Sequence, residues 1–437
     1  LVRSEWNETV FGSQLYNAFK EVKAIFDPNG IMNPGKIIAN QKMTDNLRFG
    51  GAYQTEEINT FFDFSNDGGF ARSVELCNGV GACRKKLVGT MCPSYIATLD
   101  EEHSTRGRAN ILRAALSGKL DDEGFTSHRV YEALDLCLEC KGCKGECPSN
   151  IDMARMKYEF LAHFYDKHGL PLRNRAFGHI AALSKLGSAL APLSNWIVNR
   201  PWHKWMLEQA IGVDRRRTLP NFARETFDHW FHHRSNRPKD DADRPTVVFF
   251  PDTFTNYNDP HIGIAAVEVL ECAGYRVILS EPRKCCGRPF ISKGMLHQAK
   301  AVAEYNIEHL DRYASQGWPI VGCEPSCLMT FRDDYLDLVD DPRAKRVADH
   351  IFLIDEFLAQ EHEAGRLRLL FREVNKTLKL HGHCQQKAIV GIEPTMTALK
   401  LVPGYEVTAL NTGCCGMAGS FGYEKEHFDI SIKIAKD

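Results

Sequence analysis

The sequence predicts a multidomain protein of mixed α+β and α/β class, with an α-helical, cysteine-bearing domain followed by two tandem α/β repeats that contain parallel sheets. Three observations lead to this prediction. The chain has 437 residues, enough for several domains of ~100–200 residues each. Its 15 cysteines form two groups, seven between Cys77 and Cys147 and eight between Cys272 and Cys415. Strand and helix patterns alternate only after residue 245.

Composition narrows the function classes. Lys+Arg is 54 against Asp+Glu 56, a formal charge of −2, so the basic excess of a general nucleic-acid binder is absent. No run of ~18 apolar residues predicts a spanning helix, and the start at Leu1 lacks the apolar stretch of a signal peptide. A long chain of this kind is expected in the cytoplasm, with its cysteines serving metal or redox chemistry rather than disulfides.

Residues 1–40 predict one helix followed by turns. Leu15, Phe19, Val22 and Phe26 repeat at spacings of four, three and four, which places them on one helical face. Prolines and glycines after Phe26 end the helix. Because a lone helix cannot bury its own apolar face, we expect this segment to be the tail of an upstream domain. Residues 41–70, rich in Gly, Asn and Asp, are expected to form a linker.

The helical domain is predicted at 71–170, with helices at 101–116 and 151–165 and its cysteines on loops. The strongest motif is Cys137-x2-Cys140-x2-Cys143-x3-Cys147-Pro148. Three evenly stepped thiolates closed by Cys-Pro are typical of a loop that wraps a cubane iron–sulfur cluster. Structural zinc is the alternative, but zinc needs only two spaced cysteine pairs.

A partner motif precedes it, with Cys77, Cys83 and the pair Cys92-Pro93; Val80 stands where a further thiolate is expected. In paired motifs the fourth cysteine ligates the other cluster. Cys92 is therefore expected to join Cys137, Cys140 and Cys143 on one [4Fe–4S] cluster. Cys147 would join Cys77 and Cys83 at a second site that holds a [3Fe–4S] cluster, uses a non-cysteine ligand or is empty.

Two arginines, Arg106 and Arg108, follow the partner motif. They either offset the negative charge of a cluster or belong to a solvated helix start capped by Ser104. Residues 171–244 predict a cysteine-free helical connector. Its helix at 179–198 has an apolar face, which either lies in a membrane interface or, the favoured interpretation, packs on the protein itself; the face comprises Ile180, Leu183, Leu186, Leu190, Leu193 and Ile197.

From residue 245 the order strand, helix, strand recurs, which predicts parallel sheets. Strands are expected at 246–250, 275–279, 319–321, 378–380 and 405–407, and helices at 261–273, 294–315 and 386–400. Gly274-Tyr275-Arg276-Val277 precedes one Cys-Cys-Gly sequence and Gly404-Tyr405-Glu406-Val407 precedes the other. This self-similarity defines two repeats, 245–345 and 346–437, the second incomplete.

Adjacent cysteines followed by glycine suit an iron–sulfur ligand loop. Neither repeat has a complete ligand set, so the cysteines of both are expected to line one shared site; a zinc site or a reactive dithiol pair is the alternative. These candidate ligands are Cys285, Cys286, Cys327, Cys384, Cys414 and Cys415. Cys272 is expected to be a small buried residue, and Cys323 stays unassigned.

Residues 25–36, Ile-Phe-Asp-Pro-Asn-Gly-Ile-Met-Asn-Pro-Gly-Lys, resemble the closing segment of FAD-linked D-2-hydroxy-acid dehydrogenases. The paired ferredoxin-like motifs followed by Cys-Cys-Gly repeats resemble the iron–sulfur subunit that partners such flavoproteins. Both in one chain, in this order, resemble the long bacterial fusion form, which includes enzymes acting on D-2-hydroxyglutarate. Asp252, in place of an opening cysteine, also resembles that subfamily.

The resemblance implies that the chain is the C-terminal iron–sulfur half, with a ferredoxin-like domain and two Cys-Cys-Gly repeats. It implies hydride transfer from C2 of a D-2-hydroxy acid, of D-2-hydroxyglutarate or D-lactate type, to FAD in an upstream domain. Electrons would then pass through 4Fe-4S clusters to a quinone or another carrier. Catalytic residues would lie outside this chain, and Asn33 and Lys36 would approach the flavin.

The family further implies a homo-oligomer, cytoplasmic or peripheral on the inner face of the membrane. One rival function is disulfide reduction at a Cys-Cys-Gly cluster, as in heterodisulfide reductases, which the repeats also resemble. The other is a zinc-stabilised binding protein without enzymatic activity. Zinc without iron or sulfide would exclude both redox functions.

Overall fold

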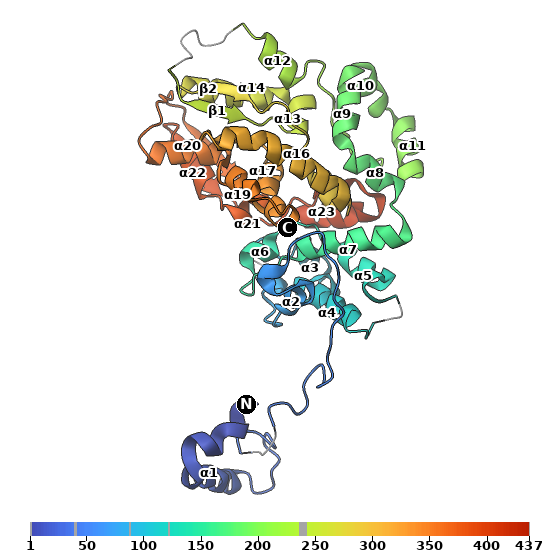
Figure 1. The fold of residues 1–437 in the computed structure, drawn as a ribbon, viewed down its shortest axis with the longest axis vertical. Coiled ribbons are helices and arrows are strands. Elements are labelled where there is room, and N and C mark those ends of the chain that lie inside the picture. Colours follow the sequence, from blue (N-terminus) through green and yellow to red (C-terminus); the bar gives the residue numbers. More distant parts are fainter. Residues whose placement is uncertain (1, 39–41, 87–88, 121–122, 236–242, 437) are drawn as a thin grey trace. The chain divides into compact units, whose positions relative to one another are not determined.

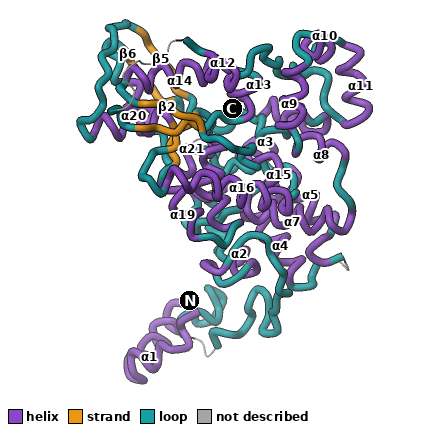
Figure 2. Tube along the Cα trace, turned by 45° about the horizontal axis from the view of Figure 1, so that its top comes forward, coloured by secondary structure: helices purple, strands orange, loops and turns teal. Residues whose placement is uncertain are grey.

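The computed structural model describes residues 2–38, 42–86, 89–120, 123–235 and 243–436. The chain forms two compact units, an N-terminal unit of residues 1–55 and a main unit of residues 56–437. Helices predominate and the strands are few and short, as Figures 1 and 2 show. The mixed α/β class with parallel sheets agrees with the prediction.

In the N-terminal unit, a 3-10 turn (Val2–Trp6) leads into α1 (Asn7–Phe26). The predicted helix is present and begins earlier than its apolar repeat. It ends at Asp27, whose buried carboxylate accepts hydrogen bonds from the backbone N–H groups of Ile31 and Met32, both at 2.9 Å. Leu15, Val22 and Phe26 are exposed, so the apolar face of this helix is not buried within its own unit.

The main unit opens with a helical domain. The two predicted helices are present as α4 and α7, capped by the side chains of Ser104 and Asp152. Its helices are α2 (Phe70–Glu75), α3 (Pro93–Thr98), α4 (Thr105–Leu116), α5 (His128–Asp135), α6 (Gly142–Glu146) and α7 (Met153–His168).

The expectation that the whole stretch 41–70 is a linker is wrong for its second half. Phe62 and Phe64 are buried in the core of the helical domain. The backbone N–H groups of Phe61 and Phe62 donate to the buried carboxylate of Glu159, at 2.9 and 3.1 Å. Two apolar aromatic residues thus anchor a segment whose overall composition is that of a loop.

The connector consists of α8 (Leu172–Gly178), α9 (Ile180–Ala189), α10 (Leu193–Val198), α11 (Pro201–Ile211) and α12 (Phe227–His233). The single helix expected at 179–198 is broken at Pro192, which has no N–H to continue the ladder. Its apolar face, expected to pack on the protein, is instead largely exposed: Leu183, Leu186, Leu190 and Leu193 are 44–58% exposed. No helix of the described residues is both long and apolar enough to cross a membrane.

A four-stranded parallel sheet with strand order β2-β1-β3-β4 is built mainly by the first repeat; its edge strand β4 lies beyond the predicted boundary at residue 345, so this sheet extends past the repeat as predicted. Side chains of β1 alternate between two cores: Val247 and Phe249 pack with α12 and α14, whereas Val248 and Phe250 lie in the core that includes α16. The strands are β1 (Thr246–Phe249), β2 (Arg276–Leu279), β3 (Ile320–Gly322) and β4 (Ile351–Leu353).

Helices connect and cover these strands (Figure 1). The predicted helices at 261–273 and 294–315 are α14 (Pro260–Cys272) and α16 (Leu296–Ala314). The others are α13 (Thr253–Tyr257), α15 (Arg288–Ser292), α17 (Pro325–Met329), α18 (Tyr335–Leu338), α19 (Pro342–Asp349) and α20 (Ile354–Glu363).

The second repeat has a two-stranded parallel sheet of β5 (Lys376–Leu380) and β6 (Tyr405–Ala409). The helix expected at 386–400 is two helices, α21 (Cys384–Ile389) and α22 (Glu393–Lys400), and the described chain ends in α23 (Phe428–Lys436). The predicted strands of both repeats are therefore present, and the second repeat builds the smaller sheet.

Candidate iron–sulfur sites

Four cysteines of the helical domain line one small cavity: Cys92, Cys137, Cys140 and Cys143. Cys92 directly precedes α3, Cys137 follows α5, and the other two flank the start of α6. Glu139 and Lys141 adopt left-handed backbone angles, φ 54° and 56°, which coil the loop between these cysteines. The structure thus brings together the set that the crossed motif pattern predicts, which we call group 1.

A buried cation lies against group 1. Arg108 is 1% exposed, and its Nη1 lies 3.5 Å from the Cys92 Sγ. Its other nitrogens donate to the Ser94 hydroxyl and to the Ala133 carbonyl oxygen, both at 2.9 Å. Burial alone raises the pKa of Cys92, but the positive charge of Arg108 and the hydrogen bonds to the sulfur leave that pKa below its usual value. Arg108 therefore favours the thiolate, the form that binds metal.

Group 2 comprises Cys77, Cys83 and Cys147, which line a second small cavity together with Val80. This is the other half of the crossed pattern, with valine where a fourth thiolate is expected. Arg106 also lines the cavity and is fixed there by an ion pair with Glu101 at 2.7 Å. The two arginines of the sequence motif therefore lie at different cysteine groups, Arg108 at group 1 and Arg106 at group 2.

Group 3 comprises Cys285, Cys286 and Cys327 in the first repeat. The Sγ atoms of Cys286 and Cys327 lie 3.0 Å apart. The neighbouring Cys286 thiol and burial raise the pKa of Cys285. Asp252 is buried nearby, where the opening cysteine is missing, and burial and the charge of Glu324 raise its pKa.

Group 4 comprises Cys384, Cys414 and Cys415 in the second repeat. The Cys414 thiol hydrogen bonds to both neighbours. This lowers the pKa of Cys384 to about 6 and that of Cys415 to about 5. Burial and the charge of Cys384 raise the pKa of Cys140, so group 4 lies beside group 1.

Both Cys-Cys-Gly glycines are required by the backbone. Gly287 and Gly416 have left-handed angles, φ 78° and 75°. A Cβ on Gly416 would lie 2.3 Å from the Ser431 carbonyl oxygen. Glycine thus turns the chain immediately after each cysteine pair, which explains the repeated motif.

The six cysteines of the repeats contact one another within two groups, each built by one repeat. A contact between the groups is the hydrogen bond that joins Ser326, next to Cys327, to the His383 ring, next to Cys384, at 3.3 Å. Helices α17 and α21, which carry these residues, pack against each other. A single shared site therefore stays a prediction, whereas the assignment of ligands to groups 3 and 4 follows the repeats.

The helical domain contacts both repeats close to group 1. A Cβ on Gly145 of α6 would lie 3.0 Å from both Cα and the carbonyl oxygen of Ala388 in α21. The ammonium of Lys141, 1% exposed, binds the carboxylates of Asp333 and Asp334, the latter at 2.6 Å. Burial disfavours the charge, but these carboxylates raise the pKa of Lys141 overall. A buried ion pair and a glycine contact therefore dock the ligand loop.

Two further sets of side chains have the spacing that a single metal ion requires. Zinc–sulfur bonds of ~2.3 Å require ligand atoms close to one another. Among the described residues, three or more such ligand atoms within 4.8 Å of each other occur as Glu123, His128 and His168, and as Glu424, Glu426 and His427; neither set includes a cysteine.

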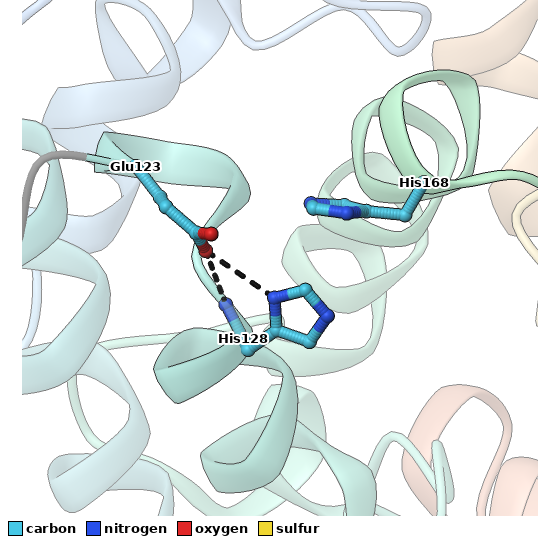
Figure 3. A group of neighbouring side chains, drawn as sticks. All are labelled: Glu123, His128 and His168. Atoms are coloured by element: carbon cyan, nitrogen blue, oxygen red, sulfur yellow. Dashed lines mark hydrogen bonds and ion pairs between the residues drawn. The ribbon is translucent and has the colours of Figure 1, made fainter.

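Figure 3 shows the first of these two sets, which sequence reasoning missed. The Glu123 carboxylate accepts hydrogen bonds from the His128 backbone N–H at 3.1 Å and pairs with its ring at 3.3 Å. The His168 Nε2 lies 3.1 Å from the Thr126 carbonyl oxygen. All three side chains are exposed, and these bonds fasten the start of α5 to the end of α7.

The second set belongs to a buried network that joins four segments of the main unit. His427 pairs with Asp135 at 2.8 Å and with Glu424 at 2.9 Å. Glu424 also binds Lys293 at 2.8 Å and Arg173 at 3.5 Å. Burial opposes protonation of His427, but the two carboxylates outweigh it and raise the pKa of His427 to about 9.

We predict that this network makes stability fall at alkaline pH. The folded pKa of His427 exceeds the ordinary value of 6.5, so its contribution is complete below that value and is lost as pH rises through about 9. The shift corresponds to about 3 kcal/mol. The melting temperature should fall between pH 7 and 10 in the wild type, and His427→Gln should flatten this fall. His362→Gln, at an exposed histidine, is the matched control; equal pH profiles for all three proteins would contradict the prediction.

The remaining sequence-predicted residues are placed as follows. Asn33 and Lys36 are exposed on the turns after α1, and their approach to a flavin stays a prediction. Cys272 is exposed on α14 rather than buried, because the helix turns it away from Leu270 and the core. Cys323 lies near Asp252 and Asp355, and burial together with their charges raises its pKa to about 12.

Comparison with known proteins gives three family matches. Residues 73–151 match the family described as 4Fe-4S dicluster domain, residues 247–332 match the cysteine-rich domain family, and residues 1–37 match the C-terminal domain of FAD-linked oxidases. No solved structure matches the chain.

Among curated proteins, the D-2-hydroxyglutarate dehydrogenases of Escherichia coli (strain K12) and Pseudomonas putida are 25% and 26% identical over 99% of this chain. The chain spans 46% of the length of each. One subunit of the anaerobic glycerol-3-phosphate dehydrogenase of Escherichia coli (strain K12) is 30% identical over 62% of this chain and 67% of its own length.

Proposed function

Since this chain belongs to the family of dehydrogenase iron–sulfur proteins that join a 4Fe-4S dicluster domain to a cysteine-rich domain, we propose that it is the electron-transfer half of a flavin-dependent D-2-hydroxy-acid dehydrogenase. The similarity to D-2-hydroxyglutarate dehydrogenases extends over 99% of the chain. The match of residues 1–37 to FAD-linked oxidases supports a flavin-binding part as the partner.

The arrangement of the cysteine groups carries the proposal. Group 1 holds four cysteines around one cavity beside a buried arginine, the donor set of a [4Fe–4S] cluster. Group 2 offers three, and groups 3 and 4 offer three each. When bound, clusters at these groups would supply single-electron transfer between the flavin and an external acceptor.

The fold of the protein holds these cysteine groups close to one another. Gly145 holds group 1 against α21 of the second repeat, where group 4 lies, and the Lys141 ion pairs with Asp333 and Asp334 hold it against the first repeat. The bond between Ser326 and His383 joins group 4 to group 3. The order group 1, group 4, group 3 would let electrons pass across the main unit from the dicluster domain to the cysteine-rich domain.

The test uses the protein expressed from its complete gene and purified without air. Iron and acid-labile sulfide should be present, and D-2-hydroxyglutarate or D-lactate should bleach the visible cluster absorbance, whereas the L-enantiomers should not. Zinc without iron would overturn the electron-transfer proposal. Bleaching by glycerol 3-phosphate but by neither D-2-hydroxy acid would overturn the substrate class.

A further inference from the structure

Three exposed side chains of the helical domain form a cluster with the composition of a transition-metal site. Glu123 precedes the 3-10 turn that leads to α5, His128 is the first residue of α5, and His168 is the last residue of α7. Each offers one ligand atom, and these atoms lie within 4.8 Å of one another. Figure 3 shows the Glu123 carboxylate and the His168 ring pointing toward the His128 ring from opposite sides.

The types of ligand atom select the kind of ion. Two imidazoles and one carboxylate form a ligand set that zinc takes in proteins, with water completing the shell. Calcium and magnesium prefer shells made of oxygen atoms, so two ring nitrogens disfavour them. The cluster therefore fits zinc or a similar divalent transition metal.

The pair of Glu123 and His128 already has the separation that such an ion requires. The Glu123 Oε2 and the His128 Nδ1 lie 3.3 Å apart. Two ligands on a tetrahedral ion with bonds of ~2.0–2.1 Å are ~3.3–3.4 Å apart. The same Oε2 accepts a hydrogen bond from the His128 backbone N–H at 3.1 Å, which holds the carboxylate beside the ring. An ion can therefore take the place of the proton that the carboxylate and the ring share.

The His168 ring is held in place by its neighbours. Its centroid lies 4.5 Å from that of the His128 ring, and both rings pack on Phe164, which is 6% exposed. Its Nε2 lies 3.1 Å from the Thr126 carbonyl oxygen. Because a carbonyl oxygen only accepts, Nε2 carries the proton of the neutral ring and Nδ1 keeps the lone pair, as in metal-binding histidines. Rings fixed in this way lose little further freedom when an ion binds.

The other set of close ligand atoms, Glu424, Glu426 and His427, is less suited to a metal ion. Glu424 binds Lys293 at 2.8 Å and Arg173 at 3.5 Å, and Arg173 also binds Glu426 at 2.5 Å. These two cations offset the carboxylates and would repel a metal ion. At the first set, the partner that Glu123 holds at 3.3 Å is a histidine ring, itself a metal ligand.

We propose that Glu123, His128 and His168 bind one zinc ion, which ties the start of α5 to the end of α7. These two helices bracket the loop 136–152, which holds three cysteines of group 1. The ion would be structural and separate from the cysteine groups, and the inference does not depend on the electron-transfer function proposed above.

The test measures zinc uptake by the anaerobically purified chain during dialysis against buffered free zinc. Iron is determined on the same samples, because vacant cysteine groups would also take up zinc. The wild type should hold one zinc ion per chain more than His128→Gln or His168→Asn, and zinc should raise its melting temperature more than theirs. Glu123→Gln, which keeps the shape and removes the charge, should raise the free zinc needed for half-saturation at least tenfold.

His229→Gln is the matched control and should take up as much zinc as the wild type. His229 also pairs with a carboxylate, Glu225 at 3.1 Å, and stacks on a second ring, His233. Among the described residues, however, these three do not form a set of close ligand atoms.

Equal zinc content in the wild type and the variants at His128 and His168 would overturn the proposal and leave the three side chains as a hydrogen-bonded contact. An equal loss of zinc from His229→Gln would also overturn it, because any exposed histidine pair would then suffice. Displacement of the ion by calcium would overturn the class of metal. Absence of iron from all samples would refute the electron-transfer proposal alone, since the zinc site is judged by the difference between variants.

Discussion

Cys140→Ser should cost the chain about four irons, the content of one [4Fe–4S] cluster. Cys140 lines the group 1 cavity with Cys92, Cys137 and Cys143, and no further cysteine lines it to replace the lost sulfur. Serine presents a hydroxyl, a poorer ligand for iron than thiolate. The visible absorbance should fall together with iron and acid-labile sulfide, measured on anaerobically purified protein.

Cys272→Ser is the matched control, because Cys272 is exposed on α14 and belongs to none of the four groups. Its iron content should equal that of the wild type. An unchanged visible spectrum in Cys140→Ser would refute the assignment of group 1 as the ligands of a [4Fe–4S] cluster. Loss of all iron from this variant would instead indicate that the remaining groups hold clusters only when group 1 is filled.

Much of the fold could be predicted because its signals are local. The spacing from Leu15 to Phe26 predicts α1, and the apolar run at 246–250 predicts β1. β4 was missed because Ile351–Leu353 runs directly into α20, which begins at Ile354, with no turn residue between them to separate a strand from the helix. It forms because β3 offers an unpaired edge to the chain that follows it in sequence.

The apolar face predicted at 179–198 shows what hydrophobic periodicity cannot predict. A repeat of leucines identifies the apolar face of a helix but not what covers that face. Here Leu186 and Leu190 are exposed to solvent. Pro192 was visible in the sequence as a break, yet the leucine repeat spans it.

The crossed ligand sets came from motif spacing, whereas their surroundings required three dimensions. Arg108 was noted in sequence, but its contact with Cys92 depends on how α4 packs against α3. Lys141 meets Asp334 across 193 residues, and no local pattern indicates such a pair. Charge compensation around a site is therefore harder to predict than the site's own ligands.

Gly145→Leu should slow electron transfer while leaving the iron content unchanged. Gly145 lies in α6, and its Cβ would meet the Ala388 backbone of α21 at 3.0 Å. Because backbone atoms cannot give way as a side chain can, a leucine must push the two helices apart. Cys384 begins α21, so group 4 would move away from Cys140. Electron transfer between redox groups falls steeply with distance.

With the protein expressed from its complete gene, substrate-driven reduction of an external acceptor should fall about tenfold or more, since small displacements of reacting groups have effects of this size. Gly145→Ala, with only the Cβ, should give a smaller loss. Gly51→Leu is the control, because nothing lies within 4 Å of a Cβ on Gly51. If iron is lost together with the rate, leucine has disturbed the ligand loop itself. If neither changes, the contact of α6 with α21 does not set the distance between groups 1 and 4, and transfer must leave group 1 by another route.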